Sequence, residues 1–243
     1  MTGTKELQGK DWSNKTIGEF VADDYRIASV FEKYGIDFCC GGHQTLAAAC
    51  QERELELQTV RQEIEAAGRE PMERRENFAA WELSFLADYI VNNHHTYLNE
   101  NTGPIAAYAH KIAEVHGAHH PEVKEIAIRF DQVAADLVEH LREEEEVLFP
   151  AIKRIEAARK AGNPAAAKDL AAIKSSLQQL HREHEAVGDG VHEIRRLANG
   201  YALPADVCNT FMLTYRKLKE FEDDIHKHVH LENNILFRKA AEL

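Results

Sequence analysis

Two stretches of the chain repeat one pattern of histidine, glutamate, leucine and phenylalanine, HLREEEEVLF (140–149) and HVHLENNILF (228–237). In both, the glutamate follows the histidine by four residues, so on a helix the imidazole and the carboxylate share one face, one turn apart. Asp136 and Asp224 precede the two histidines by one further turn. They could accept a ring N–H and fix its tautomer, although an exposed salt bridge explains them equally well. The repeat predicts two equivalent helices that each offer a histidine and a glutamate to a metal ion.

The intervals between histidines along the chain suggest which further residues join these four in a metal site. His94 and His184 are separated by nearly the same interval as the two repeated histidines. In antiparallel helices, residues equidistant from a turn lie at the same height, and the midpoints between successive histidines fall on, or just beyond, breaks rich in glycine and proline. The predicted layer has four histidines, with two glutamates one turn away: His94, His140, His184, His228, Glu144 and Glu232.

This set of side chains has the chemistry of a metal site. Four imidazoles and two carboxylates are too many ligands for one tetrahedral ion, but they suffice for two ions bridged by the carboxylates. Mixed nitrogen and oxygen ligands with open positions favour a non-haem di-iron centre over zinc. For any single one of the 14 histidines, a solvated position on a charged helix is the better interpretation. The repeat and the shared layer together favour the metal site.

Several other histidines could compete for the same role. Some adjoin a chosen histidine or have the same four-residue spacing: His95, His181 with Glu185, and His226 with His230. Only the repeat favours His184 and His228 over them. His116 lies near the first break and is considered only as an outer neighbour of the site. Within the acidic run 143–146, Glu144 is the one residue expected to point inward.

A second candidate site contains two adjacent cysteines. Cys39 and Cys40 lie in the sequence DFCCGG (37–42). Adjacent cysteines rarely bond to each other because the ring is strained, so two free thiols are expected. The glycines permit a turn that exposes the thiols at a helix start, where a thiolate is stabilised; the alternative is a pair of buried small hydrophobic residues. Cys50 and Cys208 are isolated and are interpreted as structural.

The elements that position these residues are helices. The chain is rich in alanine, glutamate, leucine, lysine and glutamine at helical periodicity and lacks alternating β-branched runs, which predicts an all-α fold. Three breaks, 117–121, 162–164 and 199–204, each combine a glycine that can end a helix with a proline that can begin the next. They divide residues 77–243 into four helices, which short connections arrange as an antiparallel up-down-up-down bundle.

The sequence of the amino-terminal part predicts a separate small domain. Short amphipathic stretches predict a group of short helices over residues 16–67, including the cysteine pair. The charged, proline-containing stretch 68–76 is the predicted linker, and residues 1–15 are predicted to be a flexible terminus.

Composition excludes several classes of function. The formal charge is −12, with 29 Lys and Arg against 41 Asp and Glu, whereas a nucleic-acid binder needs a basic surface. No stretch approaches the roughly 18 apolar residues of a membrane helix. The polar first residues lack a secretory signal, which predicts a cytoplasmic protein, and four cysteines do not form a disulfide framework.

The cysteine motif, the small amino-terminal domain and the bundle ending in HVHLENNILF together resemble the repair of iron centres family, the di-iron proteins of the YtfE and ScdA type. The resemblance covers residues from about 16 to 241. It implies a hemerythrin-like bundle whose di-iron centre has four histidines and two bridging glutamates, matching the six residues chosen above. It also implicates Cys39 and Cys40 in function. Arg238 departs from the family, which usually has proline at this position.

The resemblance implies that the protein restores iron-sulfur clusters damaged by nitric oxide or oxidants by supplying iron. The expected partners are damaged iron-sulfur proteins or a cluster scaffold, nitric oxide or O₂ as ligands of the iron, and a second copy of the chain in a homodimer. Two alternatives use the same centre. One is an enzyme that reduces nitric oxide at two adjacent irons, and the other is a sensor or carrier of diatomic gases.

Overall fold

The computed structural model describes residues 12, 15–69 and 77–243. These residues form helices, turns and one isolated β-bridge between Thr16 and Thr45, and no strand occurs in this part of the chain. The predicted all-α fold is confirmed. Two compact units are present. Among the described residues, the first comprises those up to Trp81 together with His230–Ile235, and the second comprises Glu82–Val229 and Leu236–Leu243.

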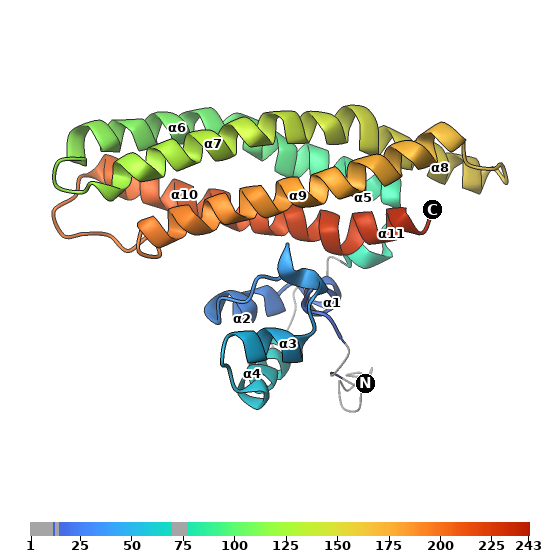
Figure 1. Ribbon diagram of the computed structural model, residues 1–243, viewed down its shortest axis with the longest axis horizontal. Helices are drawn as coiled ribbons and strands as arrows, with labels where there is room; N and C mark the ends of the chain where they lie inside the picture. Colours follow the sequence, from blue (N-terminus) through green and yellow to red (C-terminus); the bar gives the residue numbers. More distant parts are fainter. Residues whose placement is uncertain (1–11, 13–14, 70–76) are drawn as a thin grey trace. The chain divides into compact units, whose positions relative to one another are not determined.

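The small unit contains four short helices (Figure 1), α1 (Ile17–Asp23), α2 (Ile27–Lys33), α3 (Leu46–Glu52) and α4 (Leu57–Arg69). Thr16 begins α1 with a capping box, in which its hydroxyl accepts from the Glu19 amide and the Glu19 carboxylate accepts from the Thr16 amide. The helices bury one shared set of apolar side chains: Ile17, Phe20, Phe31, Leu46, Val60 and Ile64. Each is worth roughly 1.5–3 kcal/mol when fully buried, so four helices too short to be stable alone hold one another.

The helices between residues 83 and 241 form a bundle of four long helices, three of which are built from two α-helical segments (Figure 1). The segments are α5 (Leu83–Ile90) and α6 (Thr96–His116), α7 (Glu122–Glu143) and α8 (Phe149–Lys160), α9 (Ala167–Leu197), and α10 (Asn209–Leu231) and α11 (Phe237–Ala241). Within each composite helix, the two segments are joined by one π-helical turn: Val91–His95, Glu144–Leu148 and Glu232–Leu236. The chain therefore continues as a helix through each join.

The three predicted breaks are where the structure turns. The long helices end at His116, Lys160 and Leu197 and resume at Glu122, Ala167 and Asn209. Gly162 and Gly200 adopt left-handed backbone conformations, with φ of 72° and 65°; glycine takes this conformation without a steric penalty. The order of the helices matches the predicted up-down-up-down bundle.

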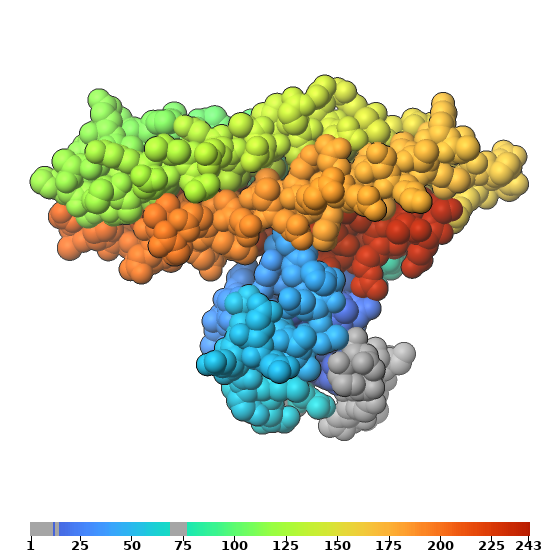
Figure 2. All heavy atoms as spheres, in the orientation of Figure 1, coloured from blue at the N-terminus to red at the C-terminus, as the bar shows by residue number. Residues whose placement is uncertain are grey.

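Close packing fixes the helices against one another. Helices α7 and α9 are in contact along the bundle, and the space-filling view shows their side chains meeting, yellow-green against orange (Figure 2). A Cβ on Gly190 of α9 would lie 2.4 Å from Cγ2 of Val133 on α7. The absence of a side chain at Gly190 therefore lets the two helices pack this closely. Phe130 of α7 packs edge-on against Phe221 of α10.

The small domain was expected to end at residue 67, and α4 runs to Arg69. The predicted flexible terminus 1–15 lies largely outside the described residues, as do positions 70–76 of the predicted linker 68–76. No helix in the described part of the chain is both long and apolar enough to cross a membrane.

Candidate metal centre

Four side chains from three helices converge inside the bundle. One donor atom from each of His140, Glu144, His184 and Glu232 lies within 4.8 Å of the others, and all four residues are buried. The Nε2 atoms of His140 and His184 are 3.0 Å apart, and Nε2 of His140 is 3.4 Å from Oε2 of Glu144. Imidazole nitrogens and carboxylate oxygens at this spacing can surround one metal ion.

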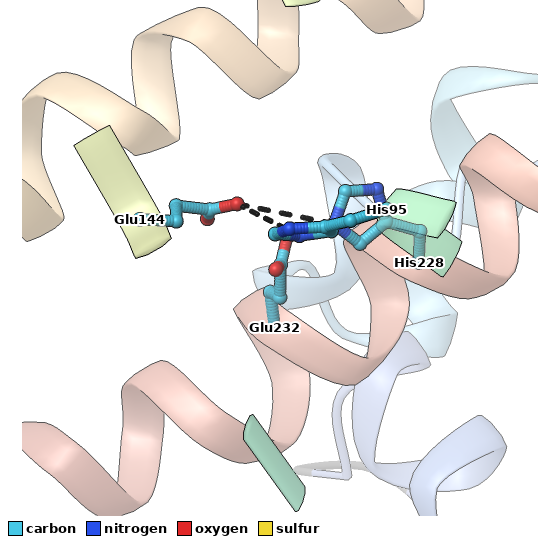
Figure 3. A group of neighbouring side chains, drawn as sticks. All are labelled: His95, Glu144, His228 and Glu232. Carbon is cyan, nitrogen blue, oxygen red and sulfur yellow. Dashed lines mark ion pairs between the residues drawn. The ribbon is translucent and has the colours of Figure 1, made fainter. Parts of the chain in front are cut away.

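A second group of four shares the same two glutamates (Figure 3). His95, Glu144, His228 and Glu232 also place one donor atom each within 4.8 Å of the others. Oε2 of Glu144 is 3.4 Å from Nε2 of His95 and 4.0 Å from Nε2 of His228. Two adjacent groups with two carboxylates in common have the ligand arrangement of a two-metal site with bridging carboxylates.

Burial makes the two carboxylates a strong indication of bound cations. Glu144 and Glu232 are 0% exposed. A buried carboxylate is costly unless it is paired with positive charge or coordinates a metal. Two first-row divalent ions would supply the compensating charge, so the residues present fit such a pair.

Carboxylates outside the two groups orient the histidine rings. Glu183 Oε2 is 3.0 Å from Nδ1 of His140, and Glu145 Oε1 is 2.8 Å from Nδ1 of His95. The hydrogen bond to His140 holds the pKa of Glu183 below its usual value. A ring that donates Nδ1–H to a carboxylate presents its Nε2 lone pair inward and becomes a more basic metal ligand.

These outer carboxylates differ from the residues considered in the sequence. Asp136 is exposed, and Asp224 lies beside His94, with Oδ1 2.9 Å from Nδ1. Glu183 and Glu145 directly adjoin His184 and Glu144, but they orient the rings of other helices. Their position next to a predicted metal ligand was the only feature of the sequence that could have identified Glu183 and Glu145.

The structure also differs from the sequence analysis over which histidine comes from the first helix. It places His95, rather than His94, in the candidate ligand group. The reason is the π-helical turn Val91–His95, which inserts an extra residue into the helix. Counting residues from the turns assumes regular helices and so misses this shift. The other five predicted residues lie in the two groups.

The repeated phenylalanines form apolar walls of the site. Phe149 stacks on His95, with ring centroids 5.7 Å apart, and Phe237 stacks on His184 at 5.6 Å. Each phenylalanine follows a glutamate of the repeat by five residues, the period of a π-helical turn. Each π turn beginning at Glu144 or Glu232 thus brings the phenylalanine five residues later to the same face as the glutamate. This explains why the repeated pattern includes the phenylalanine.

The cysteine pair is buried in the small unit. Cys39 and Cys40 are 3% and 9% exposed. Asp37 Oδ1 accepts hydrogen bonds from both cysteine amides, at 2.9 and 3.0 Å, and lies 3.1 Å from Sγ of Cys39. The hydrogen bond with Cys40, burial and the charge of Asp37 together hold the pKa of Cys39 well above its usual value. The protonated thiol is therefore favoured, in contrast to the exposed thiolate considered from the sequence.

The remaining cysteines have different environments. Cys50 is buried, whereas Cys208 is exposed. Sγ of Cys208 lies 3.1 Å from Nε2 of His116. Backbone amides at the start of α10 and the His116 ring lower the pKa of Cys208 to about 7. His116 thus contacts this thiol and is not a member of either ligand group.

Two family models match the chain. Residues 13–68 match the ScdA_N domain, described as a domain of unknown function (DUF542). Residues 86–240 match the hemerythrin HHE cation binding domain. The second match spans both candidate ligand groups.

The chain is also similar to curated proteins over nearly its whole length. It is 30% identical over 225 residues to the iron-sulfur cluster repair protein ScdA of Staphylococcus haemolyticus, covering 93% of this chain and 97% of the relative. The ScdA protein of Staphylococcus epidermidis is 29% identical over 226 residues, again 93% and 97%. The iron-sulfur cluster repair protein YtfE of Yersinia pestis is 28% identical over 230 residues, covering 95% and 98%.

Proposed function

Because the chain belongs to the family of iron-sulfur cluster repair proteins of the ScdA and YtfE type, with a hemerythrin HHE domain, we propose that it holds two iron ions and supplies iron to damaged iron-sulfur clusters. The supporting observation is the pair of ligand groups that share two fully buried carboxylates. The proposed ligands are His95, His140, His184 and His228 with Glu144 and Glu232 as bridges. Bound iron would serve as cargo and could take nitric oxide or O₂ as a ligand.

The residues of the chain hold and orient the metal ligands. Glu183 and Glu145 fix two imidazoles with Nε2 directed inward. Phe149 and Phe237 cover two of the rings with apolar surface, which limits the access of water. Protons compete with metal for imidazole and carboxylate ligands, so proton uptake by these ligands would favour release of iron.

Cys39 and Cys40 are proposed to act in the repair step. The supporting observation is that donor atoms of Asp37, Cys39 and Cys40 lie within 4.8 Å of one another. A thiolate is a good iron ligand, and the raised pKa of Cys39 means that binding iron must displace its proton. Replacing both cysteines by serine should lower repair and leave the iron content unchanged. Unaltered repair would assign the pair a structural role.

Partners and location complete the proposal. Damaged iron-sulfur proteins, or a scaffold that carries the cluster, would receive the iron, and a homodimer is proposed as the assembly. All four cysteines are free thiols. Since reducing compartments keep thiols unpaired, this supports a cytoplasmic location.

Iron content tests the ligand assignment. The purified chain should contain about two irons, as the two ligand groups imply. Glu144→Leu and Glu232→Leu should each lose iron while keeping their helicity, because each removes an oxygen ligand common to both groups. Glu146→Leu is the matched control, since Glu146 is exposed on the same π turn. Equal iron in all three variants would refute the assignment.

Reactivation of a nitric-oxide-damaged iron-sulfur enzyme tests the function. Iron-loaded protein should restore activity under anaerobic conditions, whereas metal-free protein and Glu232→Leu should not. Equal recovery with and without loaded iron would contradict iron supply. Steady nitrous oxide production from nitric oxide and an electron donor, without reactivation, would instead favour nitric oxide reduction at the same centre.

A further inference from the structure

We propose that His192, Glu222 and His226 form an additional binding site for a divalent transition-metal ion, separate from the two ligand groups described above. A donor atom from each lies within 4.8 Å of the others. None of the three belongs to either group that contains Glu144 and Glu232. The proposal therefore does not depend on the function of the bundle centre.

Two neighbouring helices position these residues. Glu222 and His226 are four residues apart on α10, so they share one face, and His192 comes from α9. Glu222 is 1% exposed and His226 is 5% exposed, while His192 is the most exposed of the three. His226 precedes His228 by two residues, so their side chains leave the helix in directions about 160° apart. The same helix can therefore serve two separate sites.

The spacing suits a first-row ion. Nε2 of His226 is 3.9 Å from Oε1 of Glu222, and the rings of His192 and His226 have centroids 5.4 Å apart, inclined at 55°. Ligands about 2.0–2.2 Å from a tetrahedral ion are about 3.3–3.6 Å from one another. Small side-chain rotations would close the observed spacing to this value. Two imidazoles and one carboxylate leave a fourth position for water.

Arg195 holds the carboxylate of Glu222 in place. Nε of Arg195 donates to both oxygens of Glu222, at 2.8 and 2.9 Å. Glu222 is thus fixed before metal binds. The positive charge of Arg195 opposes a cation, so this site should be weaker than one with two carboxylates.

Titration with Co²⁺, followed by visible absorption and equilibrium dialysis, tests the site. His192→Ala should bind one Co²⁺ fewer than the unchanged full-length protein, because it removes one ligand at a partly exposed position. His181→Ala is the matched control, since His181 is on the same helix, exposed beside Glu185 with Nε2–Oε1 of 3.8 Å. Equal Co²⁺ binding by the two variants, with unchanged helicity, would overturn the proposal.

A second variant separates this site from the bundle centre. The Glu232→Leu variant should still bind the Co²⁺ ion that depends on His192. The double variant Glu232→Leu with His192→Ala should therefore bind one Co²⁺ fewer than Glu232→Leu alone. Disappearance of that ion in Glu232→Leu alone would show that it belongs to the bundle centre and would contradict an additional site. Failure to find iron in the bundle would leave this result unaffected.

Discussion

The adjacent histidines of the first bundle helix have different contacts. His95 contributes to a candidate ligand group, while Nδ1 of His94 pairs with Asp224. His95→Ala should therefore lose at least half of the bound iron, and His94→Ala should retain most of it. Iron analysis of the two variants, matched for helicity, checks this difference. Greater loss of iron from His94→Ala than from His95→Ala would instead identify His94 as the ligand, as the sequence predicted.

The exposed thiol of Cys208 should react near neutral pH. Backbone amides and His116 lower its pKa to about 7, so the thiolate fraction, and the alkylation rate, should rise through pH 7. In His116→Ala the midpoint should move to higher pH because the imidazole partner is lost. Cys39 should react slowly over this range, since its hydrogen bond with Cys40 and its burial favour the neutral thiol. Mass spectrometry of iodoacetamide-treated protein measures both rates.

A carboxylate from one helix stabilises the start of another. Glu156 of α8 accepts hydrogen bonds from the amides of Leu83 and Ser84, at 2.9 and 3.1 Å, and from the Ser84 hydroxyl. These are amides that α5 leaves unpaired at its amino end. Glu156→Gln should lower the free energy of unfolding by about 1 kcal/mol, the typical value of a helix cap, as measured by urea denaturation.

The same interaction has a defined pH dependence. Burial raises the pKa of Glu156, but the hydrogen bonds from Ser84 and Leu83 outweigh it, so the pKa falls below its usual value. The stabilisation is therefore present above the unfolded-state pKa and is lost as pH falls through the lower folded-state pKa. The difference between wild type and Glu156→Gln should shrink on acidification. A constant difference would contradict a charged cap.

Metal binding should stabilise the molecule as a whole. Any ligand that binds only the folded state adds RT ln(1 + [L]/Kd), about 2.7 kcal/mol at a free concentration 100 times Kd. Removing iron with a chelator should lower the Tm of the protein, because Glu144 and Glu232 remain buried without their compensating cations. In Glu232→Leu, chelator should change the Tm much less. Calorimetry measures both shifts.

Helical periodicity and turn residues were sufficient to predict the bundle, because amphipathic segments and glycine–proline breaks depend on local sequence. The repeat, together with the spacing of the histidines, located five of the six histidine and glutamate positions that the structure gathers. It could not distinguish His94 from His95 as the ligand, since the π turn Val91–His95 depends on packing between helices. The outer carboxylates Glu183 and Glu145 were missed for a related reason, as each contacts a ring from a different helix. The burial of Cys39 likewise depends on tertiary contacts.

The sharing of Glu144 and Glu232 by both ligand groups has a consequence for loading. The first ion to bind would draw both carboxylates into place and so complete most of the neighbouring coordination sphere. The second ion would then bind to a preorganised pocket, with less ordering entropy left to lose. Departure of one ion would likewise loosen the other. We therefore expect cooperative occupancy, in which chains carry either two ions or none, so that iron leaves the protein in pairs.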